Sequence, residues 1–205
     1  IGLTSGVGTV LGTETNHTHP NIQETETIGD YPMFGANLAN TGHTPDETGP
    51  DGPLMESWSF AANSRTQSPP VVVDGTVYVA SGRNNTLHAL EATSGVQQWE
   101  VETSDWAFAT PTVHNGTLYT IVRDGTVYAL DAETGDQEWT VEKTRTNSTP
   151  GSTSSPTVTD GTVYLGTSDG LDIEGGHVYA LNATDGSEQW DFQTAKPVMT
   201  SPAVV

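Results

Sequence analysis

The sequence predicts an all-β fold made of repeated four-stranded units, and three observations support that prediction. Tryptophans recur at similar intervals, turn glycines recur between short β-branched runs, and no segment shows sustained helical periodicity. The recurring tryptophans are Trp58, Trp99, Trp139 and Trp190, spaced 41, 40 and 51 residues apart. Four-stranded units repeating at this interval are typical of β-propeller blades, because sandwiches and barrels do not repeat their sequence in this way.

Within the first period, the pattern predicts four strands at 70–73, 76–80, 86–90 and 96–101. The first two are separated by an Asp-Gly turn, a strong hairpin signal because such turns need a positive φ at their centre. The proline that opens the first strand removes one ladder donor, which is tolerated at the first residue of a strand. The third and fourth strands are separated by a second turn glycine four residues before the tryptophan.

The periods predict an incomplete ring. Three are whole, at about 69–101, 111–141 and 156–192, and a strand is expected on either side, at 54–60 and 201–205. A closed propeller has at least about four blades, so we expect residues 31–205 to be part of a larger ring of about seven or eight. Residues 1–30 are expected to form a flexible leader, and their apolar start fits the end of an export signal.

Composition excludes several classes of function. Acidic residues outnumber basic ones 26 to 6, for a formal net charge of −20, which disfavours nucleic acid and anionic membranes as partners. The acidic residues are dispersed among regular apolar patterns, so they indicate a folded protein with an acidic surface. This composition resembles that of proteins from salt-loving archaea. The chain has no cysteine and no apolar run long enough to span a membrane. We therefore expect an extracellular or cell-surface protein without membrane insertion.

Strand alternation sorts the connections onto two rims of a propeller. Turns after the first and third strands keep their length, whereas loops after the second strand and connections between periods vary. We call the second set the variable rim, where recognition is expected. All six basic residues map to it: Arg65, Arg83, Arg123, Lys143, Arg145 and Lys196. They predict a site for an anionic ligand.

Other interpretations of the charged and aromatic residues on this rim remain open. The basic residues could instead form local ion pairs with Asp105, Asp124, Asp169 and Asp172. Trp106 is a candidate ligand contact together with Phe108, although packing beneath the loops explains both equally well. Asp169, Asp172 and Glu174 offer oxygen ligands for Ca²⁺, but EF-hand spacing is absent and an exposed acidic loop is the simpler interpretation. No catalytic residue is identified.

The repeat resembles that of a known family. The segments 91–99, 131–139 and 182–190 are similar to the Ala-x-Asp-x-x-Thr-Gly-x-x-x-Trp repeat of the pyrroloquinoline-quinone (PQQ) enzyme-like propellers, which include quinoprotein and BamB-like members. Tyr31-Pro32-Met33-Phe34-Gly35 is similar to the segment before the first blade in that family, so the resemblance covers 31–205. It implies that the four repeated tryptophans dock one blade onto the next.

Three functions are compatible with these features. The favoured one is a non-catalytic binding or scaffold propeller without a cofactor, which takes a protein or an anionic ligand on the variable rim. The resemblance also implies a PQQ-dependent dehydrogenase of alcohols or sugars with Ca²⁺, although no catalytic aspartate or calcium-ligand set can be matched to a position. A structural cell-surface protein fits the acidity equally well.

Overall fold

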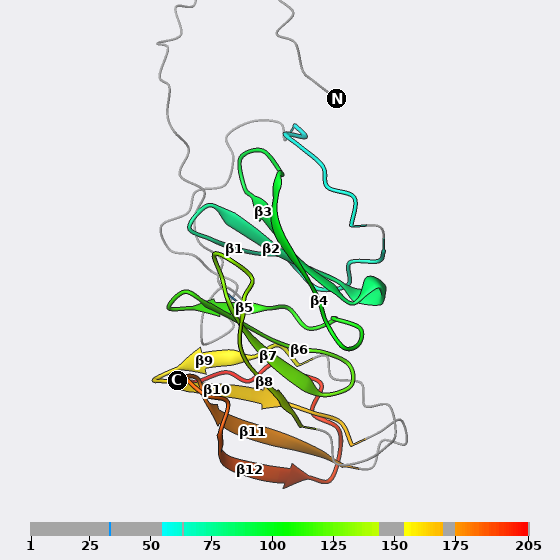
Figure 1. Ribbon diagram of the computed structural model, residues 1–205. Coiled ribbons are helices and arrows are strands. Elements are labelled where there is room, and N and C mark those ends of the chain that lie inside the picture. Colours follow the sequence, from blue (N-terminus) through cyan, green and yellow to red (C-terminus); the bar gives the residue numbers. More distant parts are fainter. Residues whose placement is uncertain (1–32, 34–54, 63, 144–153, 170–174, 205) are drawn as a thin grey trace, which may run out of the picture.

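The computed structural model describes Met33 and residues 55–62, 64–143, 154–169 and 175–204. Within these ranges the chain forms three four-stranded antiparallel sheets that follow one another along the sequence (Figure 1). The first holds β1 (Val71–Val73), β2 (Thr76–Ser81), β3 (Thr86–Glu91) and β4 (Gln97–Glu102). The second holds β5 (Thr112–His114), β6 (Thr117–Ile121), β7 (Thr126–Asp131) and β8 (Gln137–Glu142). The third holds β9 (Thr157–Thr159), β10 (Thr162–Gly166), β11 (Gly176–Asn182) and β12 (Glu188–Thr194).

Strand order within each sheet follows the chain, so every connection inside a sheet joins neighbouring strands. The first strands of the three sheets, β1, β5 and β9, lie beside one another. This arrangement confirms the prediction of propeller blades, and the four strands expected in the first period lie within one residue of their predicted bounds. A short 3₁₀ turn, η1 (Gly82–Asn84), interrupts the loop between β2 and β3.

The two flanking strands were predicted wrongly. Residues 55–60 and 201–204 form no strand, because neither stretch makes ladder hydrogen bonds in the described part of the chain. They pack through individual contacts instead. Trp58 Nε1 donates to the carbonyl of Ala92, and Thr157 Oγ1 donates to the carbonyl of Pro202. Trp58 and Pro202 therefore keep their repeat positions although the residues around them form no strand.

Three of the repeated tryptophans make hydrogen bonds from one unit to the next. The indole N–H groups of Trp58, Trp99 and Trp139 donate to alanine carbonyls, which belong to Ala92, Ala132 and Ala183 at 2.8, 3.0 and 2.9 Å. Each accepting carbonyl lies just after the third strand of the following sheet. The indole thereby buries its rings against the next blade while its polar atom stays paired.

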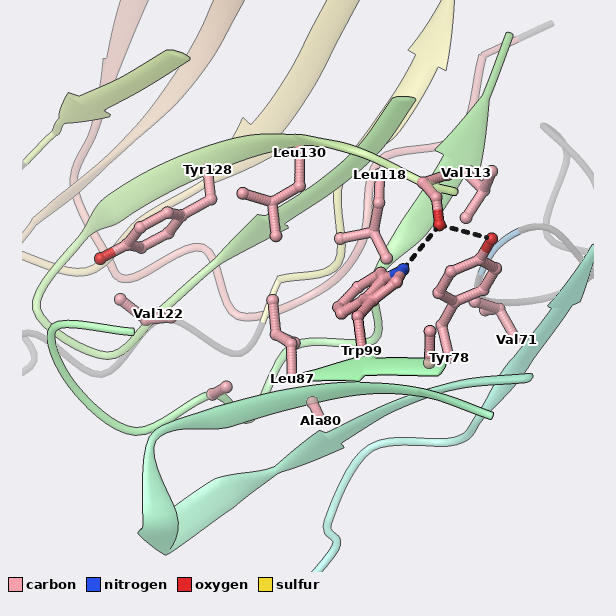
Figure 2. Close-up of a cluster of buried hydrophobic side chains, with 13 residues drawn as sticks. Val71, Tyr78, Ala80, Leu87, Trp99, Val113, Leu118, Val122, Tyr128 and Leu130 are labelled. Carbon is pink, nitrogen blue, oxygen red and sulfur yellow. Dashed lines mark hydrogen bonds between the residues drawn. The ribbon is translucent and has the colours of Figure 1, made fainter. Parts of the chain in front are cut away.

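A tyrosine shares the carbonyl in two of these joints. The hydroxyl of Tyr78 donates to Ala132 and that of Tyr119 donates to Ala183, at 3.1 and 3.2 Å. Figure 2 shows the Tyr78 and Trp99 side chains pointing to the same acceptor within a buried cluster. Burial raises the pKa of both tyrosines above the usual value, so the hydroxyls keep the proton that they donate.

The turn glycines allow the tryptophan of one blade to pack closely against the backbone of the next. Gly95, Gly135 and Gly186 have φ of +69°, +78° and +71°, a region that side chains disfavour. A Cβ atom on any of them would also lie 2.5–2.9 Å from the docked indole. Positive φ and the indole contact both require glycine at this point of the repeat.

Trp190 holds the fourth repeat position but differs in its surroundings. Its side chain is 46% exposed, and Phe192 beside it on β12 is 65% exposed. Its ring contacts Tyr164 of its own sheet, with centroids 6.0 Å apart. Within the described residues, the Trp190 indole has no acceptor carbonyl like those of the other three tryptophans, so its predicted docking role stays a prediction.

A second joint lies at the first strands and was not anticipated from the sequence. The N–H of Thr110 donates to Ser155 Oγ, and the N–H of Ser155 donates to Ser201 Oγ, both at 3.0 Å. Thr112 Oγ1 donates to the carbonyl of Pro156 at 2.6 Å, as Thr157 does to Pro202. Serine and threonine next to the repeated proline thus link successive blades.

We expect the Ser155→Ala variant to lose about 1–3 kcal/mol of unfolding free energy. The variant removes the acceptor for the N–H of Thr110, a residue that is 2% exposed, and leaves that donor buried without a partner. Urea unfolding followed by tryptophan fluorescence measures the change. Ser104→Ala is the control, since Ser104 is exposed and its described hydrogen bond uses the backbone N–H. Equal stabilities of the two variants would contradict this account of the joint.

Candidate ligand site on the variable rim

Three loop segments converge where the first two sheets meet on the variable rim. They are the η1 turn, the 103–111 connection and the 122–125 loop. Backbone hydrogen bonds tie the 103–111 connection to both neighbours, because the Arg123 N–H donates to the carbonyl of Trp106 and the Thr103 N–H donates to the carbonyl of Asn85, which directly follows η1. The segments come from two different sheets and the connection between them, so the backbone fixes their side chains near one another.

Two aspartates shape the loops from within. Asp105 Oδ1 accepts a hydrogen bond from the N–H of Trp106, and Asp124 Oδ1 accepts one from the N–H of Thr126, both at 2.8 Å. Aspartate is common in tight turns because its short side chain can satisfy nearby backbone donors in this way. These carboxylates are therefore engaged in turn formation.

The arginines of both flanking loops lie over one indole. The guanidinium carbons of Arg83 and Arg123 are 5.2 and 4.3 Å from the ring centroid of Trp106, within the range of a cation–π interaction. We call these three residues the Arg–Trp cluster. All three remain at least partly exposed. The structure thus brings together three of the residues predicted to form the ligand site.

The Arg–Trp cluster has no internal counter-ion among the residues that the structure describes. Neither Arg83 nor Arg123 forms an ion pair there, and the expected pairing with Asp105 and Asp124 is not observed. Asp105 and Asp124 lie in the same loops, but they accept backbone N–H groups and do not pair with either arginine. The two guanidinium groups can therefore bind an external oxyanion through their remaining N–H donors. The local surroundings therefore favour anion binding at this point of an acidic molecule.

The other predicted cations have different surroundings. Lys143 forms an ion pair with Glu188 at 3.0 Å and lies over the Tyr179 ring at 5.3 Å, with a side chain that is 10% exposed. Lys143 is therefore ion-paired, but with Glu188 and not with one of the four aspartates considered as partners. The backbone carbonyl of Arg65 accepts a hydrogen bond from the Gly82 N–H, and the backbone carbonyl of Lys196 accepts one from the Thr194 hydroxyl. Arg145 lies outside the described residues.

The acidic insertion gives no support to a calcium site. Asp172 and Glu174 lie outside the described residues, so their positions stay untested. Asp169 faces the buried imidazole of His177, whose other ring nitrogen is 3.0 Å from Asp191. No group of three or more potential metal ligands occurs in the described ranges.

A pocket of about 640 Å³ lies next to the Arg–Trp cluster. It is lined by residues that precede the repeated prolines Pro70, Pro111, Pro156 and Pro202: 67–69, Phe108, Thr110, Ser155 and 199–201. Phe108 connects the two features, because its ring centroid is 5.5 Å from that of Trp106 and its edge packs on Gly82 next to Arg83. Sequence reasoning missed this pocket, although the recurring Ser/Thr-Pro before each first strand is a signal for it.

The fold and its repeat joints define a class of protein, the β-propeller with PQQ-type repeats. The family described as outer membrane protein assembly factor BamB matches residues 54–203, and the chain belongs to that family. No protein with a curated description matches the chain in sequence. The described residues contain no helix with the length and hydropathy needed to cross a membrane.

Solved structures with this fold include enzymes and an assembly factor. The quinohemoprotein alcohol dehydrogenase ADHIIG from Pseudomonas putida HK5 is 26% identical, with a TM-score of 0.70 over 81% of this chain and 27% of that one. The quinohemoprotein alcohol dehydrogenase from Comamonas testosteroni is 24% identical, with a TM-score of 0.67 over 80% and 27%. BamB from Moraxella catarrhalis is 23% identical, with a TM-score of 0.55 over 66% and 39%. The chain therefore spans well under half the length of each.

Proposed function

We propose that this chain is a non-catalytic, exported propeller module that binds an anionic ligand, free or carried by a protein, at the Arg–Trp cluster of its variable rim. The observation that carries the proposal is the pair of arginines over Trp106 without an ion-pair partner in the described residues. Membership in a family described by an outer membrane assembly factor supports a binding role and an exported location.

A PQQ-dependent dehydrogenase is the other function to which the structural relatives point. PQQ is a tricarboxylate and would need cations and a metal ligand set around it. The Arg–Trp cluster supplies cations beside the pocket, but the described ranges contain no group of three or more potential metal ligands. The described residues therefore provide no ligand set for Ca²⁺, and we favour the binding role.

Charge reversal tests the proposal. We expect the Arg83→Glu/Arg123→Glu double variant to bind citrate at least about a hundredfold more weakly, because it removes two charge-assisted hydrogen-bonding groups and adds two repelling carboxylates. An NMR titration of ¹⁵N-labelled protein, followed at the indole N–H of Trp106, measures the affinity. An unchanged affinity would overturn the proposal.

A single charge reversal at another position of the rim tests whether a change in net charge alone weakens binding. Lys143→Glu changes the charge by the same amount per residue, but Lys143 already forms an ion pair with Glu188 away from Trp106. We expect citrate affinity to fall much less in this variant than in the double variant. The melting temperature of the double variant in concentrated salt should fall by only a few degrees. Neither arginine makes an ion pair among the described residues, and each loses one cation–π contact with Trp106.

A further inference from the structure

The pocket beside the Arg–Trp cluster differs from the cluster in charge, and this difference restricts the chemical class of ligand that can bind to both. The cluster is cationic, whereas the described lining of the pocket contains no charged side chain. A ligand that fills both must therefore carry its negative charge at one end and a neutral body at the other. The pocket volume of about 640 Å³ lies within the ~300–1,000 Å³ typical of small-molecule sites.

The neutral part of the pocket offers hydroxyl groups and apolar surface together. Hydroxyls come from the serines and threonines just before the repeated prolines, and apolar surface comes from the Phe108 ring and the 55% exposed Met199. The Oγ atoms of Ser155 and Ser201 already accept backbone N–H groups, which leaves their O–H protons to donate. Ser68 Oγ is buried in the wall without a hydrogen-bond partner. Buried hydroxyls normally have partners, so this one is a polar group that a ligand or a water can satisfy.

We infer that the ligand is an acidic sugar, with its carboxylate on Arg83 and Arg123 and its ring in the pocket against Phe108. A sugar ring has hydroxyls around its edge and C–H groups on its faces, and therefore matches a wall that mixes hydroxyl and aromatic groups. The guanidinium fork of arginine matches a carboxylate. Phe108 contacts both Trp106 and the pocket, so one molecule can reach the two parts. This inference rests on the proposed anion-binding function and specifies its ligand.

The experiment compares four probes on the full chain by isothermal titration calorimetry. Trigalacturonate carries both the carboxylates and the sugar body, maltotriose the sugar alone, citrate the carboxylates alone, and triglutamate the carboxylates on a peptide. We expect trigalacturonate to bind about tenfold or more tightly than any of the other three. Stronger binding of triglutamate would overturn the sugar assignment in favour of an acidic peptide.

Two pocket variants separate this inference from the proposed function. Phe108→Leu keeps an apolar side chain but removes the aromatic face, and Thr200→Val exchanges an exposed hydroxyl for a methyl group. We expect both to weaken trigalacturonate binding by about three- to tenfold, corresponding to the loss of one modest contact. Citrate affinity should stay unchanged in Thr200→Val, whereas Phe108→Leu can also alter citrate affinity because Phe108 packs on Trp106. Thr93→Ala, an exposed change in a turn of the opposite rim, should change neither.

The outcomes are distinct. If citrate and trigalacturonate bind equally and the pocket variants change nothing, the acidic-sugar inference fails while the anion site remains. If no anionic probe binds, the proposed function and the inference both fail.

Discussion

Replacing Trp139 with alanine is expected to reduce the unfolding free energy by about 3–5 kcal/mol. The side chain is 8% exposed and belongs to the buried cluster formed by the second and third sheets. Its removal leaves a cavity at this joint and deprives the Ala183 carbonyl of the indole donor at 2.9 Å. Urea denaturation followed by far-UV circular dichroism measures the loss, because the remaining tryptophans complicate a fluorescence comparison.

Trp190→Ala is the matched control at the same position of the repeat. Its indole is 46% exposed, so its removal should cost about 1 kcal/mol or less in the same assay. Equal losses for Trp139 and Trp190 would show that indole docking onto the next blade does not provide the stabilisation.

The second large effect is expected for Gly186→Ala, at about 2–5 kcal/mol. Alanine would be strained at a φ of +71°, and its Cβ would lie 2.7 Å from the Trp139 ring. Gly161→Ala provides a control with the same φ of +71° and open space around the added Cβ. It should cost about 1–2 kcal/mol from backbone strain alone.

The difference between the two glycine variants isolates the indole contact. We expect Gly186→Ala to be the less stable by about 1–3 kcal/mol in thermal unfolding monitored by calorimetry. The Trp139→Ala background should abolish most of that difference, since the clashing ring is then absent. A difference that persists in that background would point to a source other than the tryptophan.

Sequence reasoning predicted the blades because each landmark is local and repeated. A turn glycine, an Ala-Leu pair and a tryptophan recur in one order, so each period supports the assignment of the others. The errors at 54–60 and 201–205 arose because a strand also needs a neighbour with which to pair, and a repeat landmark does not supply one. The serine and threonine joint was missed because these residues are abundant in the chain and their partners lie one full period away.

The candidate site was predicted in part. Topology alone placed Arg83, Trp106 and Arg123 on one rim, since loop positions follow from strand alternation. Their convergence depends on backbone pairing between Arg123 and Trp106 and on turns shaped by Asp105 and Asp124, which no periodic pattern encodes. Lys143 was assigned to the same site, but its partner Glu188 comes from the following sheet, a contact visible only in three dimensions.

The joint between the first two sheets lacks two hydrogen bonds that the next joint has. Between the second and third sheets, hydrogen bonds lie at both ends of the blade, near the first strands and at the tryptophan. At the equivalent positions before the first sheet's β1, Pro69 has no N–H and Val71 has no hydroxyl, so neither of those two bonds can form. The first joint therefore depends on its other contacts, which are the hydrogen bonds of Tyr78 and Trp99 to the Ala132 carbonyl and the loop that carries Trp106. The Ala132 carbonyl is consequently the acceptor on which both of these side-chain hydrogen bonds converge.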